Sequence, residues 1–124
     1  MRAHAKNRKQ DYPGAIDDFT EAIALEPRNA NHYYNRGLAK TNTGEPAKAV
    51  YDYTAAISRD PTLKEAFGNR GHAWLTLGNY DLAIDDFTDW IRLDPKAETA
   101  WHLRGLARAE KGEHDAAIKS LGKK

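Results

Sequence analysis

The sequence predicts an all-α fold, a solenoid of stacked antiparallel helix pairs, and three observations support this prediction. First, several positions recur at one fixed interval along the 124-residue chain. Second, apolar residues within each interval are spaced by three and four, as on one face of a helix. Third, glycine and proline separate the helical stretches at fixed places. A single helix pair cannot bury its apolar stripe, so stacking of successive pairs must create the core.

Glycine, proline, alanine and aromatic positions carry the 34-residue period. The five columns are Gly37, Gly71 and Gly105; Gly44, Gly78 and Gly112; Pro27, Pro61 and Pro95; Ala15, Ala49, Ala83 and Ala117; and Phe19, Tyr53 and Phe87. Five columns on one period indicate an internal repeat rather than chance. We therefore expect one domain over residues 1–124, built from a partial unit 1–29, units 30–63 and 64–97, and a truncated unit 98–124.

Each unit is expected to contain a first helix, a tight turn, a second helix and a proline. In the third unit Phe67, Gly71 and Trp74 share one face of the first helix. Thr62-x-x-Glu65 is a predicted capping box for that helix. The expected helices are, in order, Met1–Lys9, Pro13–Leu25, Ala30–Asn42, Ala47–Ser58, Leu63–Leu77, Tyr80–Leu93, Ala97–Lys111 and His114–Leu121.

The composition argues against several classes of function. The 19 Lys and Arg residues nearly balance the 18 Asp and Glu residues, so no bulk positive field would attract nucleic acid. No apolar run is long enough for membrane insertion, and no apolar stretch follows the basic N-terminus, so a secretory signal is not expected. The chain has no cysteine, which excludes disulfides and cysteine nucleophiles and fits a cytoplasmic location.

No catalytic or cofactor-binding pattern is recognisable, and the sequence predicts that the protein is not an enzyme. It has no nucleotide-binding glycine loop, no His-Glu-x-x-His and no serine nucleophile elbow. Asp85-Asp86 looks like an acid pair, but neighbours on a helix point about 100° apart. The five histidines are scattered and offer no i, i+4 pair, so no metal or other cofactor is expected.

At these positions the chain resembles the tetratricopeptide repeat family, whose pattern runs aromatic-x-x-Leu-Gly-x-x-Tyr, then Ala-x-x-x-Phe, then Pro. The third unit supplies Phe67, Arg70-Gly71, Trp74, Tyr80, Ala83, Phe87 and Pro95. The resemblance covers essentially the whole chain. It implies a right-handed superhelix whose first helices line a concave groove, and a non-catalytic interaction module that binds a peptide segment of a partner protein there.

Several residues depart from the family pattern. Lys40 and Arg108 stand in place of an aromatic, Pro46 and His114 in place of Tyr, Trp90 in place of Ala, and Arg36, Arg70 and Arg104 in place of Leu. A half-buried arginine needs a carboxylate, and Asp18, Asp52 and Asp86 recur on the same period. Pairing within a unit would leave Arg104 without a carboxylate. We therefore favour pairing with the preceding unit, as Arg36–Asp18, Arg70–Asp52 and Arg104–Asp86; the alternative is that all these groups are solvated.

Glycine and asparagine have separate expected roles. Glycine costs about 1 kcal/mol relative to alanine inside a helix, so Gly37, Gly71 and Gly105 should allow the second helix to approach closely. Asparagine two residues earlier points away from the core, and the resemblance implies that Asn35 and Asn69 bond the backbone of a bound peptide. The alternative is that duplication copied a solvated residue.

Gly68 is a second mid-helix glycine without a packing role in the family pattern, so we expect it to form the floor of a pocket in the groove. The expected groove residues are Tyr34, Asn35, Leu38, Asn42, Glu65, Gly68, Asn69, His72 and His102. The pocket would take an apolar or aromatic side chain of the peptide. The alternative is that Gly68 is a neutral change on a solvated face.

Some members of the family clamp the C-terminal carboxylates of chaperone tails with Lys and Arg. The two possible alignments of that motif give Met1, His4, Asn35, Glu65 and Asn69, or Tyr34, Leu38, Asn69, Thr99 and Leu103. Neither set contains the cationic pair, and Glu65 would repel a carboxylate. Chaperone-tail binding is therefore not expected.

Two other functions remain open: a self-assembling structural or scaffold protein, and a regulatory segment of a larger multidomain protein. Solenoids need capped ends to stay soluble, and no polar capping helix follows the fourth unit. We therefore expect weak homo-oligomerisation through an end, around Trp101, Ile118 and Leu121.

Overall fold

The computed structural model describes the backbone of residues 11–122 and the side chains of residues 11–119. Within this range it contains helices and no strand. The helices are α2 (Tyr12–Leu25), α3 (Ala30–Asn42), α4 (Pro46–Arg59), α5 (Lys64–Thr76), α6 (Tyr80–Leu93) and α7 (Glu98–Gly122). Their bounds agree with the sequence prediction to within one residue as far as Leu93. The expected helix Met1–Lys9 lies outside the described residues.

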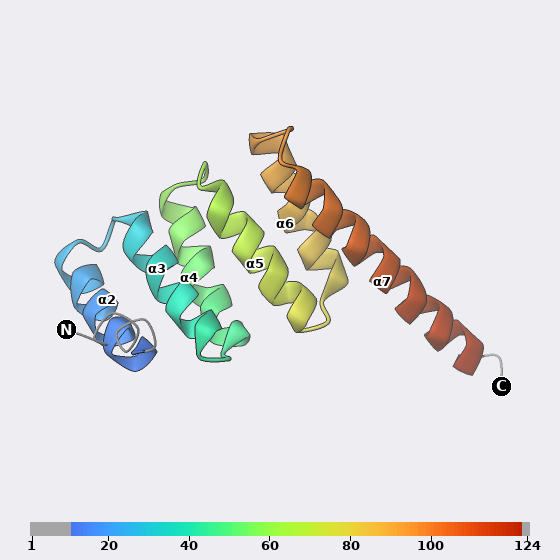
Figure 1. Ribbon diagram of the computed structural model, residues 1–124, viewed down its shortest axis with the longest axis horizontal. Coiled ribbons are helices and arrows are strands. Elements are labelled where there is room, and N and C mark those ends of the chain that lie inside the picture. The colour runs from blue at the N-terminus through green and yellow to red at the C-terminus, as the bar shows by residue number, and fades with distance from the viewer. Residues whose placement is uncertain (1–10, 123–124) are drawn as a thin grey trace, which may run out of the picture.

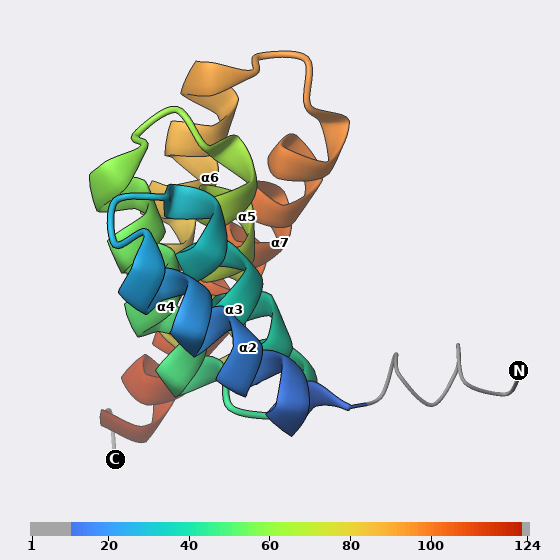
Figure 2. The same ribbon diagram turned by 90° about the vertical axis from the view of Figure 1, so that its left-hand side faces the viewer.

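The helices stack in chain order, with α2 at one end of the array and α7 at the other (Figure 1). Each helix packs against the next, and in addition α3 packs against α5 and α5 against α7. The first helices α3, α5 and α7 therefore form one layer, and the second helices α2, α4 and α6 form the other (Figure 2). This is the all-α solenoid of helix pairs that the sequence predicts.

The turns follow the glycines and prolines of the sequence. Gly44 and Gly78 separate the two helices of their units, each with a φ of 80°, a left-handed conformation that favours glycine. The second helices are capped by Glu26, Asp60 and Asp94, each directly before a proline. A proline disfavours the helical conformation of the residue before it, so these helices end where the sequence predicts.

The predicted capping box before α5 is wrong. The helix begins at Lys64 after Leu63, which makes no side-chain cap bond. Thr62 instead faces the preceding helix, and its backbone N and Oγ1 donate to Oδ1 of Asp60 at 3.0 and 2.6 Å. Because an aspartate readily accepts hydrogen bonds from residues just after it, Asp60 binds the threonine that the pattern assigns to the next helix.

Glycine notches filled by aromatic rings form the core between the two layers. A Cβ added to Gly37 would lie 2.6 Å from the ring of Tyr53, and one added to Gly71 would lie 2.7 Å from the ring of Phe87. Both rings are 0% exposed. The predicted role of these glycines is therefore confirmed: the missing side chain lets the second helix approach the first.

α7 differs from the prediction of two helices, Ala97–Lys111 and His114–Leu121. It is one helix of 25 residues, and its second half projects beyond α5 and α6 (Figure 1). Gly112 lies inside it, whereas Gly44 and Gly78 form turns. Good helix formers surround Gly112, and a Cβ added to Gly105 would meet nothing within 4 Å. Among the described residues no packing contact would stabilise a turn at Gly112, so the helix continues through it.

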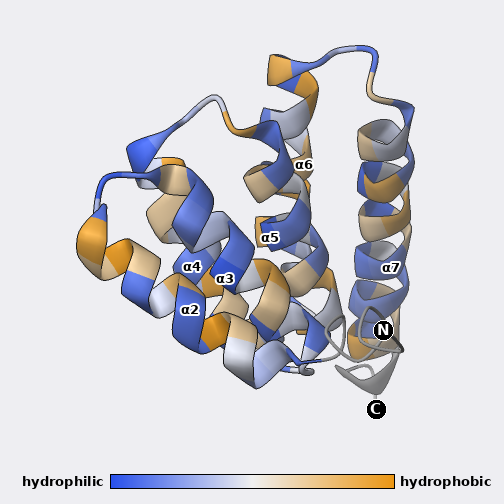
Figure 3. Ribbon diagram, turned by 60° about the vertical axis from the view of Figure 1, so that its left-hand side comes forward, coloured by the Kyte–Doolittle hydropathy of each residue, from blue (hydrophilic) through white to orange (hydrophobic). Residues whose placement is uncertain are grey.

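Hydrophilic and hydrophobic positions alternate along the helices (Figure 3). None of the helices in the described part of the chain is long and apolar enough to cross a membrane.

Candidate functional site

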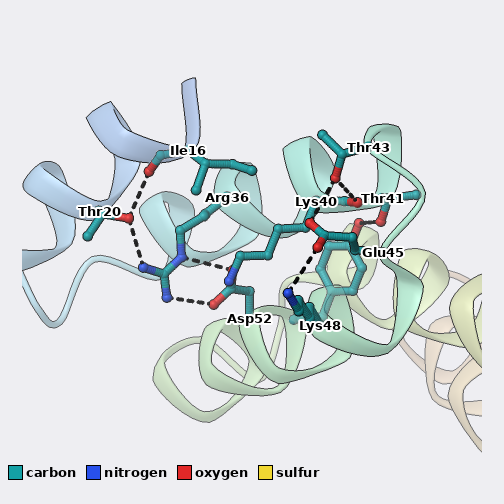
Figure 4. A network of polar contacts seen from close by, with 10 residues as sticks. Ile16, Thr20, Arg36, Lys40, Thr41, Thr43, Glu45, Lys48 and Asp52 are labelled. Atoms are coloured by element: carbon teal, nitrogen blue, oxygen red, sulfur yellow. Dashed lines mark hydrogen bonds and ion pairs between the residues drawn. The ribbon is translucent and has the colours of Figure 1, made fainter. Parts of the chain in front are cut away.

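Buried ion pairs join the first and second helices of a unit. Arg36 donates from Nε and Nη2 to the two carboxylate oxygens of Asp52, at 2.9 and 2.8 Å (Figure 4). Arg70 binds Asp86 with the same atoms and the same distances. Both carboxylates are 3% exposed. The arginines therefore pair within their own unit and join its first helix to its second.

The expected pairing with the preceding unit is wrong. The pairs Arg36–Asp18, Arg70–Asp52 and Arg104–Asp86 do not form, and a threonine occupies the place of the carboxylate: Thr20, Thr54 and Thr88 accept from Nη1 of the three arginines at 3.1, 3.0 and 3.1 Å. A guanidinium has five donors in a fixed fork, so one arginine can bind a carboxylate of its own unit and a hydroxyl of the unit before it.

The two buried carboxylates differ in their cations. Lys40 places Nζ 3.0 Å from Asp52, which therefore faces two positive charges (Figure 4). The equivalent residue in the third unit is Trp74, and among the described side chains only Arg70 binds Asp86. Burial raises the pKa of the Asp86 carboxyl above its ordinary value, against the opposing effect of the Arg70 hydrogen bonds. The charge of Asp86 is therefore less completely compensated.

The space left by the missing side chain of Gly68, expected from the sequence to be open to a ligand, is taken by a side chain of α6. A Cβ added there would lie 2.8 Å from Cζ3 of Trp90, and Gly68 itself is buried. The indole ring of α6 occupies the space above the glycine. Gly68 is thus a packing residue, because a tryptophan stands where the family has alanine.

The boundary between α3 and α5 is closed by a polar bridge. Asn69 donates from Nδ2 to the hydroxyl of Tyr34 at 3.1 Å and to the backbone carbonyl of Glu65 at 2.9 Å. The Tyr34 ring packs against Tyr53, with centroids 6.0 Å apart. Burial and, next, the charge of Glu65 raise the pKa of Tyr34, while the Asn69 bond lowers it. Tyr34 therefore belongs mainly to the helix packing.

The boundary between α5 and α7 is open. Here Gly68 and Leu103 stand in place of Tyr34 and Asn69, so neither member of the bridge is present. A groove of about 260 Å³ lies at this boundary. We call it the α5–α7 groove, and its lining residues are Glu65, Gly68, Asn69, His72, Trp90, Thr99 and Leu103. The missing bridge explains why the concave face is hollowed at this boundary.

A second groove of about 220 Å³ lies between α2 and α3. We call it the α2–α3 groove, and its lining residues are Asp11, Tyr12, Ala15, Phe19, Asn35, Leu38, Ala39 and Asn42. The expected single pocket is therefore divided. Glu65, Gly68, Asn69 and His72 share one groove, Asn35, Leu38 and Asn42 share the other, and His102 is exposed and lines neither.

The α5–α7 groove combines apolar surface with a few polar groups. Trp90 and Leu103 supply the apolar part, and Glu65 is exposed beside them. Among the described residues that line the groove there is neither lysine nor arginine. The same described part of the chain brings together no group of three His, Asp or Glu residues that could hold a metal ion. The groove offers apolar contact and hydrogen bonds to a ligand.

The sequence matches two profiles of one family. Residues 3–44 match a profile described as a TPR repeat, and residues 43–98 and 69–124 match a profile described as a tetratricopeptide repeat. The chain belongs to the tetratricopeptide repeat family. No curated protein sequence matches it.

Solved structures, two of them of TPR domains, have the same fold as this chain. The second TPR domain of human RPAP3, in complex with the HSP70 peptide SGPTIEEVD, is 30% identical with a TM-score of 0.77, over 82% of this chain and 84% of that one. The Arabidopsis OM64 TPR domain is 30% identical with a TM-score of 0.78, over 85% and 87%. MamA is 27% identical with a TM-score of 0.82, over 99% and 72%.

Three of the residues that line the α5–α7 groove are absent from the set expected from the sequence: Trp90, Thr99 and Leu103. A signal for Trp90 is present in the tetratricopeptide pattern. The separation of Gly68 and Trp90 along the chain equals that of Tyr34 and Ala56 one period earlier. In one unit the first helix carries the large residue of the pair, and in the next unit the second helix carries it. Such an exchange of size indicates that the two residues are in contact and predicts that Trp90 covers Gly68.

Proposed function

We propose that this tetratricopeptide chain is a non-catalytic protein-interaction module that binds a peptide segment of a partner in its concave face, with an apolar peptide side chain in the α5–α7 groove. The observation that carries the proposal is the opening of this groove beside Trp90 and Leu103, at a boundary where the Tyr34–Asn69 bridge has no counterpart. Concave sites that combine apolar walls with a few polar groups are typical of ligand binding.

Asn69 acts as an acceptor in this proposal. Both hydrogens of its amide are donated within the protein, to Tyr34 and to the carbonyl of Glu65. Its Oδ1 is therefore the atom that remains for a ligand, and a backbone N–H of the peptide is the matching donor. The internal bonds hold the amide in one orientation, which reduces the entropy lost when the peptide binds.

The charge of the groove favours a peptide with basic or neutral residues beside the apolar one. Glu65 lies at its edge without a neighbouring cation in the lining. The peptide bound to the human RPAP3 domain contains EEVD at its end, and a ligand of that kind would bring carboxylates next to Glu65. We therefore propose that this chain discriminates against acidic tails, by like-charge repulsion.

Fluorescence polarisation with three synthetic peptides tests the proposal: a central Phe flanked by lysines, the same peptide flanked by glutamates, and one ending in EEVD. The lysine peptide should bind tightest, by a few-fold over the glutamate peptide, because an exposed ion pair is worth up to about 1 kcal/mol. Glu65→Lys should reverse that order, and Glu21→Lys on the distant α2 should not.

A second pair of variants locates the site. Thr99→Arg places a long cationic side chain in the groove and should weaken the lysine peptide, whereas His102→Arg adds the same group to an exposed position outside it. Equal effects of the two arginines, or preferred binding of the EEVD peptide by the wild-type protein, would contradict the proposed site.

A further inference from the structure

α7 carries a glycine notch that no aromatic ring of the described residues fills, and the proposed peptide site does not involve it. Gly37 and Gly71 each receive an aromatic ring, but a Cβ on Gly105 would meet nothing within 4 Å, and Gly105 is exposed. Trp101 and Leu106 nearby are 49% and 41% exposed. α7 therefore carries the glycine notch of a first helix without the ring that fills it in the other units.

The neighbouring arginine, Arg104, also lacks the carboxylate partner that its equivalents have among the described side chains. Arg104 donates to Thr88 and lies 4.8 Å from the centre of the Trp101 ring, but no carboxylate among the described side chains binds it. In the second and third units the carboxylate and the ring come from adjacent residues, Asp52-Tyr53 and Asp86-Phe87. The matching occupant is therefore a helix that carries an acidic residue directly before an aromatic one.

The chain carries such a pair at its other end. Asp18 and Phe19 lie on α2, one period before Asp52 and Tyr53. Phe19 lines the α2–α3 groove, and α3 covers the equivalent surface in the next unit. There Tyr53 is 0% exposed, whereas Phe19 is only half-buried. α2 thus carries beside the α2–α3 groove, at equivalent positions, the acidic and aromatic residues that hold a first helix in the second and third units.

We propose that the first half of α7 from one copy of this chain occupies the α2–α3 groove of a second copy. Gly105 would lie against Phe19 of the second copy, and Arg104 would bind Asp18. The two helices would form a composite repeat unit. α2 and α7 lie at opposite ends of the array (Figure 1), so the contact is head-to-tail and repeats from copy to copy rather than closing into a dimer. The proposal is independent of peptide binding in the α5–α7 groove.

The charges and sizes match the occupied units. Arg108 is equivalent to Lys40, so Asp18 would face two cations as Asp52 does. Tyr53 shares a hydrogen bond of 2.8 Å with Thr41. Phe19 has no hydroxyl, and the residue of α7 equivalent to Thr41 is Ala109. The apolar ring would thus meet an apolar partner.

The residue types of α7 suit this slot. In the second unit a Cβ added to Gly37, the equivalent of Gly105, would lie 2.6 Å from the ring of Tyr53. Gly105 adds no Cβ to the notch, and Ala109 adds no polar group against the apolar ring of Phe19.

Sedimentation velocity over a concentration series up to about 1 mM tests the proposal on the full chain. The wild type should associate into species that grow with concentration. Gly105→Leu should weaken association by about tenfold or more, because the notch has no room for a side chain once the ring is present. The matched control is Ala116→Leu, which adds the same group to an exposed position further along α7. Unchanged far-ultraviolet circular dichroism would establish that both variants fold.

Mixing two blocked copies tests the head-to-tail geometry. Asp18→Arg blocks the α2 end and Gly105→Leu blocks the α7 end, so each variant alone should associate far more weakly than the wild type. An equimolar mixture retains one intact contact and should form a 1:1 complex that does not grow further. A monomeric wild type at about 1 mM, equal loss in the Ala116→Leu control, unchanged association of Asp18→Arg, or no complex in the mixture would each overturn the proposal.

Discussion

The second and third repeat units fill the same space with opposite choices of size. In the second unit Tyr34 of the first helix packs on the cluster that contains Ala56 of the second helix. In the third unit the equivalent residues are Gly68 and Trp90, and the large side chain comes from the second helix. The total volume is similar, but the aromatic group has moved between helices. One unit therefore presents a bridging hydroxyl to its neighbour and the other presents an indole beside an open groove.

The units also differ in charge. Asp52 binds Arg36 and Lys40, whereas Asp86 binds Arg70 beside the apolar Trp74. Despite that change, the hydrogen bonds of Arg70 have the same lengths as those of Arg36. The comparison shows that a repeat scaffold tolerates substitution when a partner residue compensates, and that each compensation alters the surface offered to ligands.

The largest expected effect separates the two carboxylates. Asp52→Asn leaves two half-buried cations without their buried carboxylate and should lower the free energy of unfolding by about 3–5 kcal/mol. Asp86→Asn should cost less, because only Arg70 loses its partner and burial already raises the pKa of Asp86. Urea denaturation at low micromolar concentration measures both. Asp18→Asn, at an exposed position, is the control. Losses below about 1 kcal/mol for both Asp52→Asn and Asp86→Asn would show that these ion pairs are solvated.

The size swap should come next. Trp90→Ala should cost about 3 kcal/mol through the cavity it leaves, and Gly68→Tyr alone should also destabilise, because its Cβ meets the indole. The double variant reproduces the second unit. It should recover at least about 1 kcal/mol relative to the sum of the single losses. Thermal and urea unfolding of the four proteins give this coupling energy, and strict additivity would rule out the compensation.

A smaller effect distinguishes the fourth unit from the other two. Arg104→Ala should change the stability of the monomer by less than about 1 kcal/mol, since no described carboxylate depends on it. Arg70→Ala, the matched variant, leaves the buried Asp86 without its cation and should cost several times more. Similar losses for both variants in urea denaturation would mean that the arginines contribute by packing alone.

The smallest effect concerns pH. Lys64 binds Asp94 at 2.9 Å and lowers the pKa of that carboxyl, mainly through the hydrogen bond; the second unit has Ala30 in place of Lys64. A lowered folded-state pKa contributes stability above the unfolded-state pKa, and this contribution is lost as the pH falls. Lys64→Ala should therefore flatten the acid limb of a stability–pH curve measured by urea denaturation. If Lys64→Ala leaves the acid limb unchanged, the loss of stability at low pH comes from other carboxylates.

The sequence by itself determined the repeat, the helices and the glycine notches. Each of these depends on local spacing: α3 and α6 begin and end at the residues expected from the pattern. Gly37 and Gly71 could be assigned because a mid-helix glycine needs a packing reason whichever neighbour supplies it.

Only the tertiary structure decided which neighbour is used. Every column has the same period, so the spacing alone allows Arg70 to pair with Asp52 or with Asp86. Counting the available carboxylates favoured Asp52, whereas the distances in the structure select Asp86. Likewise, the space above Gly68 is filled by the Trp90 ring of the next helix. Gly112 holds the position of a turn glycine in the repeat, yet it lies inside the helix α7. A repeat pattern gives only the spacing along the chain. The partner of an ion pair, the side chain that fills a glycine notch and the end of a helix depend on which side chains meet across helices.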